Sequence, residues 1–211
     1  MLAALFERIE RDYRSGVAAQ LAFDEQMERV RSRPDLHWEP GEIESVAPHE
    51  EEKLRVARAM EACAEIILRT LDDLLSMIVV AFNGRETSLN VGPALPPGIP
   101  LCQVLDAVGD YVRHRSEWRI TYNEKKEVKR TQLTSIRPLA RVISGRAEVD
   151  GYRAYDILIQ ERSPMLRILD SLSGYSAADA VGGFERLKRT VRATASAIID
   201  DQWQVWWDKR H

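Results

Sequence analysis

Four polar residues at helical spacing form the part of this sequence best suited to chemistry. They are Asp106, Asp110, His114 and Glu117, separated by four, four and three residues. Because each residue of an α-helix advances about 100° around the axis, these four side chains share one face. An imidazole beside carboxylates, with an ordinary pKa of about 6.5, is suited to proton transfer. The alternative is that His114 only bonds Asp110 or a backbone carbonyl where two helices pack together.

The apolar residues of the same predicted helix define its orientation. One arc, which we expect to be buried, contains Leu101, Val104, Leu105, Val108, Tyr111 and Val112. Arg113 points away from this arc, whereas Arg115 points toward it. We therefore expect one of three outcomes for Arg115: its stem lies along a neighbouring helix, its guanidinium meets a carboxylate, or the helix distorts there.

The stretch Asp110–Trp118 also carries a resemblance to a known family. Its sequence, D-Y-V-R-H-R-S-E-W after an apolar helical run, resembles the N-x-x-K/R-H-x-x-E-W stretch of bacterial helical proteins similar to the HEPN superfamily. Many members of that superfamily are RNA-cleaving toxins or defence effectors. The resemblance implies a helical bundle that binds or cleaves RNA, with His114 as general acid or base and Arg113 or Arg115 at the phosphate. The implied catalytic set is His114, Arg113, Asp110, Glu117 and Arg115.

The arginine of the superfamily's nuclease motif distinguishes this chain from that pattern. In the motif an arginine precedes the histidine by five to seven residues, and these positions hold Gly109, Val108 and Ala107 here. The same spacing does join Arg31 to His37, but Pro34 lies between them in a predicted loop. The difference favours a second class of function, a non-catalytic helical module that binds another protein.

The spacing of apolar residues predicts an all-α fold in a single domain, 1–211. Four long antiparallel helices are expected at 2–32, 49–83, 101–122 and 177–208, with short helices at 136–144, 152–160 and 164–172. The apolar stripe of 49–83 is the widest, so this helix should be central. Proline and glycine predict a loop over 33–47 and a connector without regular structure over 84–100. No strand is expected.

Charge is distributed unevenly along the chain. The net charge is −3, but residues 113–153 carry 11 Lys and Arg against 5 Asp and Glu. A basic segment on an acidic body can bind a polyanion such as RNA. We therefore take Lys129, Arg130, Arg137 and Arg141 as candidate nucleic-acid-binding residues. The alternative is that these side chains line ordinary solvated helices, because no aromatic residues alternate with them to stack on bases.

Several other chemistries lack a signal in the sequence. Cys63 and Cys102 have no metal-type spacing and lie in apolar surroundings, so we expect inert buried thiols. The chain contains no His-Glu-x-x-His or Glu-x-x-His pair, no phosphate-binding glycine loop and no Gly-x-Ser-x-Gly elbow, and we expect no metal and no cofactor. Neither a signal peptide nor an apolar run long enough to span a bilayer is found, which predicts a cytoplasmic protein without membrane contact.

Three tryptophans lie near the C-terminal end of the last predicted helix. Trp203, Trp206 and Trp207 fall in one arc, about a quarter turn from the apolar stripe that contains Leu187 and Ile198. Such residues either close the end of a core or form a subunit interface, where tryptophan is enriched. We expect a homodimer that uses this helix.

Overall fold

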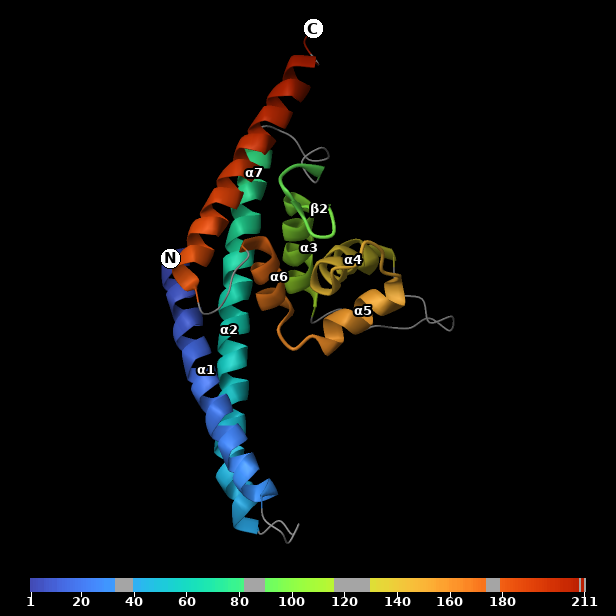
Figure 1. The fold of residues 1–211 in the computed structure, drawn as a ribbon. Coiled ribbons are helices and arrows are strands. Elements are labelled where there is room, and N and C mark those ends of the chain that lie inside the picture. The colour runs from blue at the N-terminus through green and yellow to red at the C-terminus, as the bar shows by residue number, and fades with distance from the viewer. Residues whose placement is uncertain (33–39, 82–89, 116–129, 174–178, 209, 211) are drawn as a thin grey trace.

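The computed structural model describes residues 1–32, 40–81, 90–115, 130–173, 179–208 and 210. Within these residues the chain forms seven helices and one two-stranded sheet, which confirms the predicted all-α class. The three longest helices, α1 (Leu2–Arg31), α2 (Pro40–Ala81) and α7 (Ala180–Asp208), form an elongated spine. Four shorter helices form a lobe on one side of this spine (Figure 1).

The spine is held together by apolar side chains on facing helices. α1 and α2 run antiparallel, whereas α7 lies beside the second half of α2 and runs in the same direction as α2 (Figure 1). The rings of Phe6 in α1 and Phe184 in α7 lie 5.5 Å apart between centroids. Ile67 and Leu71 of α2 are buried between these helices and the lobe, which confirms that this helix is central. α7 runs antiparallel to α1 and α3 (Figure 1), so the four long helices alternate in direction along the chain as predicted.

The predicted start of α2 is also wrong. The sequence predicts a loop over 33–47 and a helix from 49, but α2 begins at Pro40 and continues through Pro48. Residues 33–39 of that loop lie outside the described residues. A proline is favoured in the first helical turn; Pro40 occupies that position, whereas Pro48 lies inside the helix. Val46 is 7% exposed in the chain, so packing of 40–47 favours the earlier start.

The lobe consists of α3 (Leu101–His114), α4 (Arg130–Ser144), α5 (Gly151–Gln160) and α6 (Pro164–Ser173). α3 runs antiparallel to α2 (Figure 1) and buries the arc predicted from its sequence. Residues 116–122, which were predicted to continue this helix, lie outside the described residues. α4 begins six residues before its predicted start, with Pro138 in its interior. Buried Ser135 and Ile136 explain the difference, because packing holds the turn that precedes the proline.

A short hairpin precedes α3, where no regular structure was predicted. β1 (Ala94–Leu95) and β2 (Ile99–Pro100) pair antiparallel, with Leu95 opposite Ile99. Gly98 allows the turn because its φ is +100°, a value that side chains disfavour. Leu95 and Ile99 are both buried, so the hairpin contributes apolar side chains to the core and fixes the start of α3.

The first turn of α6 is capped from a distant helix. Glu61 of α2 accepts hydrogen bonds from the backbone N–H groups of Met165 and Leu166, at 2.9 and 3.0 Å. These N–H groups have no partner inside the helix, because the first turn lacks preceding carbonyls. Pro164 occupies the position before them, where its missing N–H costs nothing. One carboxylate therefore fastens the lobe to the spine.

Two further predictions concern the thiols and the membrane. Cys63 and Cys102 are buried and free, as predicted, and burial raises the pKa of Cys102 to about 11. Such a thiol stays protonated and unreactive near neutral pH. Across the described ranges, no helix combines the length and the apolarity that a bilayer crossing requires.

Candidate functional site

The predicted acidic and imidazole strip lies on the outer side of α3. Asp106 and His114 are exposed and Asp110 is half-buried. His114 is the last residue of α3, and Glu117 lies outside the described residues. The hydroxyl of Ser135 in α4 donates a hydrogen bond to Asp110 Oδ2 at 3.2 Å. Part of the strip therefore joins two helices of the lobe.

Both arginines beside His114 are engaged by carboxylates. Arg115 Nη1 lies 2.9 Å from Glu65 Oε2 in α2, which is one of the three outcomes expected for this residue. Arg113 Nη2 lies 3.4 Å from Asp110 Oδ1 and 3.9 Å from Asp72 Oδ2. These contacts link α3 to α2. The same contacts engage the guanidinium groups of Arg113 and Arg115, which the predicted catalytic role would require to bind a phosphate.

α2 and α3 approach closely where Asp72 faces Gly109. A Cβ atom at position 109 would overlap the carboxylate of Asp72, so a larger residue would force that side chain to move. Burial, together with the charge of Asp106, raises the pKa of Asp72 to about 6. Arg113 opposes this shift without cancelling it. The glycine therefore lies where α2 and α3 make their close contact.

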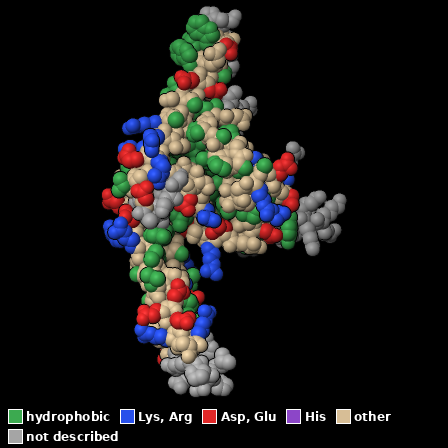
Figure 2. Space-filling model, in the orientation of Figure 1, with side chains coloured by type: hydrophobic (Ala, Val, Ile, Leu, Met, Phe, Trp, Pro, Cys, Tyr) green, Lys and Arg blue, Asp and Glu red, His purple; other side chains and the backbone are tan. Residues whose placement is uncertain are grey.

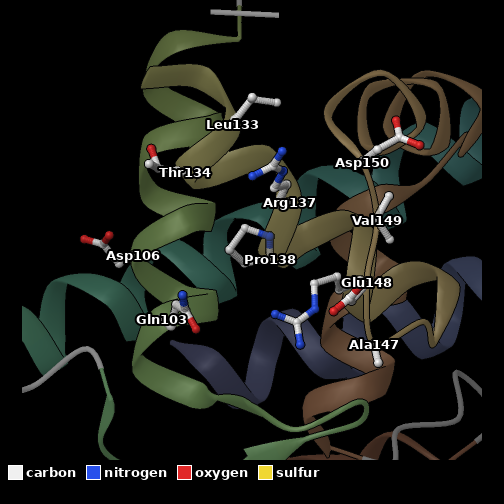
Figure 3. Close-up of a pocket in the computed structure, with 11 residues that line it drawn as sticks. Gln103, Asp106, Leu133, Thr134, Arg137, Pro138, Ala147, Glu148, Val149 and Asp150 are labelled. Atoms are coloured by element: carbon white, nitrogen blue, oxygen red, sulfur yellow. The ribbon is translucent and has the colours of Figure 1, made fainter. Parts of the chain in front are cut away.

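A pocket of about 770 Å³ opens between α3, α4 and the segment that leads into α5 (Figure 3). It begins at Asp106, so it lies at one end of the strip that ends at His114. Two of the candidate nucleic-acid-binding residues, Arg137 and Arg141, line it. Their spacing of four residues places them on one face of α4. The other lining residues are Gln103, Leu133, Thr134, Pro138, Ala147, Glu148, Val149 and Asp150.

The turn of the chain after α4 places two acidic residues, Glu148 and Asp150, along one side of the pocket. α4 ends at Ser144, and Gly145 adopts a φ of +66°, the left-handed conformation that glycine commonly provides just after a helix. The chain then passes the pocket at 147–150 and enters α5. Asp150 caps that helix, because its Oδ1 accepts a hydrogen bond from Arg153 N at 2.8 Å. Glu148 precedes it as an exposed side chain.

Charged side chains of both signs line the pocket without forming ion pairs with one another. Among the described residues, no ion pair within 4.0 Å joins Arg137 or Arg141 to the carboxylates of the pocket. Nε of Arg141 is buried and has no hydrogen-bond partner in the described part of the chain. A buried donor without a partner costs on the order of 1–3 kcal/mol, and such groups are rare in folded proteins.

The sequence pointed to Asp106 on α3 and to Arg137 and Arg141 on α4, but not to the wall of the pocket formed by residues 147–150. Arg137 and Arg141 were candidates because they belong to the basic segment. Of the other two candidates, Lys129 lies outside the described residues, and Arg130 is the first residue of α4. Glu148 and Asp150 were missed. Their only local signal is the position of Asp150 before a predicted helix, where a carboxylate suits the N-cap.

Comparisons with protein-family models, with curated proteins and with solved structures give no match to this chain. The resemblance of Asp110–Trp118 to helical proteins of the HEPN type therefore stays a prediction.

Proposed function

We propose that this protein binds single-stranded RNA, with a backbone phosphate held by Arg137 and Arg141 in the pocket between α3 and α4. The observation that carries the proposal is that Arg137 and Arg141 line one pocket, where no described carboxylate forms an ion pair with either of them. Guanidinium groups bind phosphate oxygens through paired, charge-assisted hydrogen bonds. Arg137 lines the same pocket one helical turn away, so one phosphate group can contact both side chains.

Two features of the chain support RNA as the anion. Residues 113–153 carry an excess of Lys and Arg, and the pocket lies within this segment and α3. The resemblance of Asp110–Trp118 to HEPN-like proteins favours RNA and a toxin or phage-defence setting. His114 lies eight residues after Asp106 on the same face of α3, about 12 Å along the helix axis. A strand bound in the pocket can therefore extend to His114.

Substitution of the two arginines tests the proposal. We expect Arg137→Met and Arg141→Met each to weaken the binding of a short fluorescent single-stranded RNA by about tenfold, since a charged hydrogen bond contributes about 1.5–3 kcal/mol. Fluorescence anisotropy measures the affinity. Arg153→Met is the matched control, because Arg153 is an exposed arginine in the first turn of α5 and does not line the pocket. Equal affinity of all three variants and the wild type would overturn the proposal.

Cleavage of the RNA is a separable part of the proposal. The same RNA, incubated with the wild type and with His114→Ala, is analysed by denaturing electrophoresis. Product from the wild type alone supports His114 as a general acid or base. RNA that stays intact with both proteins restricts the function to binding.

Self-association is a second proposal, and the tryptophans of α7 favour it. Trp203, Trp206 and Trp207 are 57%, 40% and 49% exposed, so they do not close the end of the core. The rings of Trp203 and Trp206 stack with centroids 5.1 Å apart. α7 continues beyond the end of α2 (Figure 1), and hydrophobic side chains cover this projecting end (Figure 2). Indoles exposed on a projecting helix are suited to a subunit interface.

Light scattering tests the dimer. We expect the wild type to be a dimer at micromolar concentration and the triple variant Trp203→Ser, Trp206→Ser, Trp207→Ser to be a monomer. Leu21→Ser is the control, because Leu21 is an exposed apolar residue in the second half of α1, a helix that runs away from the C-terminal end of α7 (Figure 1). A monomeric wild type would refute the dimer, and a dimeric triple variant would place the interface elsewhere.

A further inference from the structure

The pocket contains more carboxylate than a phosphate site needs. Asp106, Glu148 and Asp150 line it beside Arg137 and Arg141. Figure 3 shows Asp106 on α3 and Glu148 on the segment across the pocket, with Arg137 between them. A ligand that offers only an anion would gain from the arginines and be repelled by these carboxylates. The favoured ligand therefore carries an anion and hydrogen-bond donors in one molecule.

A nucleotide of RNA has both kinds of group. Its phosphate is the anion, and the edge of its base carries N–H donors that carboxylates can accept. A volume of about 770 Å³ lies within the range of pockets that bury small organic ligands, about 300–1,000 Å³, and admits one nucleotide. Phosphate and base of the same nucleotide can then contact opposite walls of the pocket.

We infer that this pocket recognises the base of the bound nucleotide and prefers guanine, with Glu148 as the residue that accepts its donors. This inference rests on the proposed RNA-binding function. Guanine presents two adjacent donors, N1–H and the N2 amino group, which match the two oxygens of one carboxylate. Adenine and cytosine present one amino group beside a ring acceptor, and uracil presents one N–H between two carbonyls. Those ring acceptors and carbonyl oxygens repel a carboxylate, whereas guanine places no acceptor between its two donors.

Glu148 is the carboxylate best placed for this role. Asp150 already uses one oxygen to cap α5. Burial, together with the charge of Asp110, raises the pKa of Asp106 and makes its ionised form costly. Glu148 is exposed and projects from a segment between two helices, and no described residue holds its carboxylate in an ion pair within 4.0 Å. Both of its oxygens are therefore accessible to a base.

The test compares RNAs that differ in one base. Four short strands of uridine are used, three of which carry a single guanosine, adenosine or cytidine at the centre, so that all four have the same phosphates. We expect the wild type to bind the guanosine strand about tenfold more tightly than the all-uridine strand. In Glu148→Gln this preference should fall to less than about threefold, since a glutamine has only one acceptor oxygen. The affinity for the all-uridine strand should be retained or rise, because the variant also removes a negative charge that repels phosphate and uracil carbonyls. Glu44→Gln, an exposed change on α2 far along the chain, is the matched control.

The outcomes separate this inference from the proposal on which it rests. Equal binding of all four strands, with Arg141→Met weakening each of them, overturns the preference for guanine and leaves RNA binding intact. A guanine preference that survives in Glu148→Gln overturns the role of Glu148. Failure of the wild type to bind any strand at low salt overturns RNA binding, and the base preference with it.

Discussion

Asp72→Asn should raise the free energy of unfolding by about 2 kcal/mol at pH 8 and by less than about 1 kcal/mol at pH 4. Burial is the main cause, and the charge of Asp106 adds to it; together they raise the pKa of Asp72 from 3.8 to about 6 in the folded protein. A shift of about two units corresponds to about 3 kcal/mol. The ion pair with Arg113, whose atoms lie 3.9 Å from those of Asp72, is already included in this shift, because it opposes the rise in pKa. We expect about 2 kcal/mol because Asp72 is only partly buried, so solvent screens part of the cost of its charge.

The sign of this effect follows from proton binding. A raised pKa means that the folded state binds the proton of Asp72 more tightly than the unfolded state does. The wild type therefore loses stability as the pH rises from about 4 to above 6, the window between the two pKa values. Asparagine cannot ionise and removes this loss.

Urea unfolding at the two pH values measures the difference. Asp200→Asn, an exposed carboxylate on α7, is the control and should leave the pH dependence unchanged. Destabilisation by Asp72→Asn at pH 8 would contradict the account, because it would mean that the ion pair with Arg113 outweighs the cost of burying the charge.

Glu61→Ala should lower the free energy of unfolding by about 2 kcal/mol, since it leaves two N–H groups at the start of α6 without an acceptor. Glu61→Gln should cost less, because one acceptor oxygen remains. Glu51→Ala provides a control at an exposed glutamate of the same helix. Urea unfolding that gives the same free energy for Glu61→Ala and Glu51→Ala would show that the cap does not hold the lobe to the spine.

Much of the fold could be predicted because its signals are local. The apolar arc of α3 and the glycine after α4 are both properties of a few neighbouring residues. The predicted starts of α2 and α4 were wrong because they relied on the local preference of Pro48 and Pro138 for a first helical turn. The rule that favours proline in a first turn is local, whereas the packing of Val46 and Ser135 that extends both helices is not.

The candidate site, like the fold, could be predicted only where its signals are local. Arg137 and Arg141 could be found from their charge and spacing, and a carboxylate was among the expected partners of Arg115. Glu148 reaches the pocket only because the chain turns at Gly145 and returns past α4. The contact of Glu61 with α6 joins residues more than a hundred positions apart. No sequence pattern near either residue predicts it. Such contacts are set by how the helices pack.

Photo-cross-linking tests the central claim most directly, because it locates the RNA on the protein. A short single-stranded RNA with 4-thiouridine beside a central guanosine is bound, irradiated and digested with the protein, and the modified peptides are identified by mass spectrometry. We expect cross-links within residues 133–150, which comprise most of α4 and the segment that passes the pocket. These cross-links should be lost in Arg141→Met. Cross-links confined to Trp203–Trp207, or unchanged in Arg141→Met, would contradict the central claim.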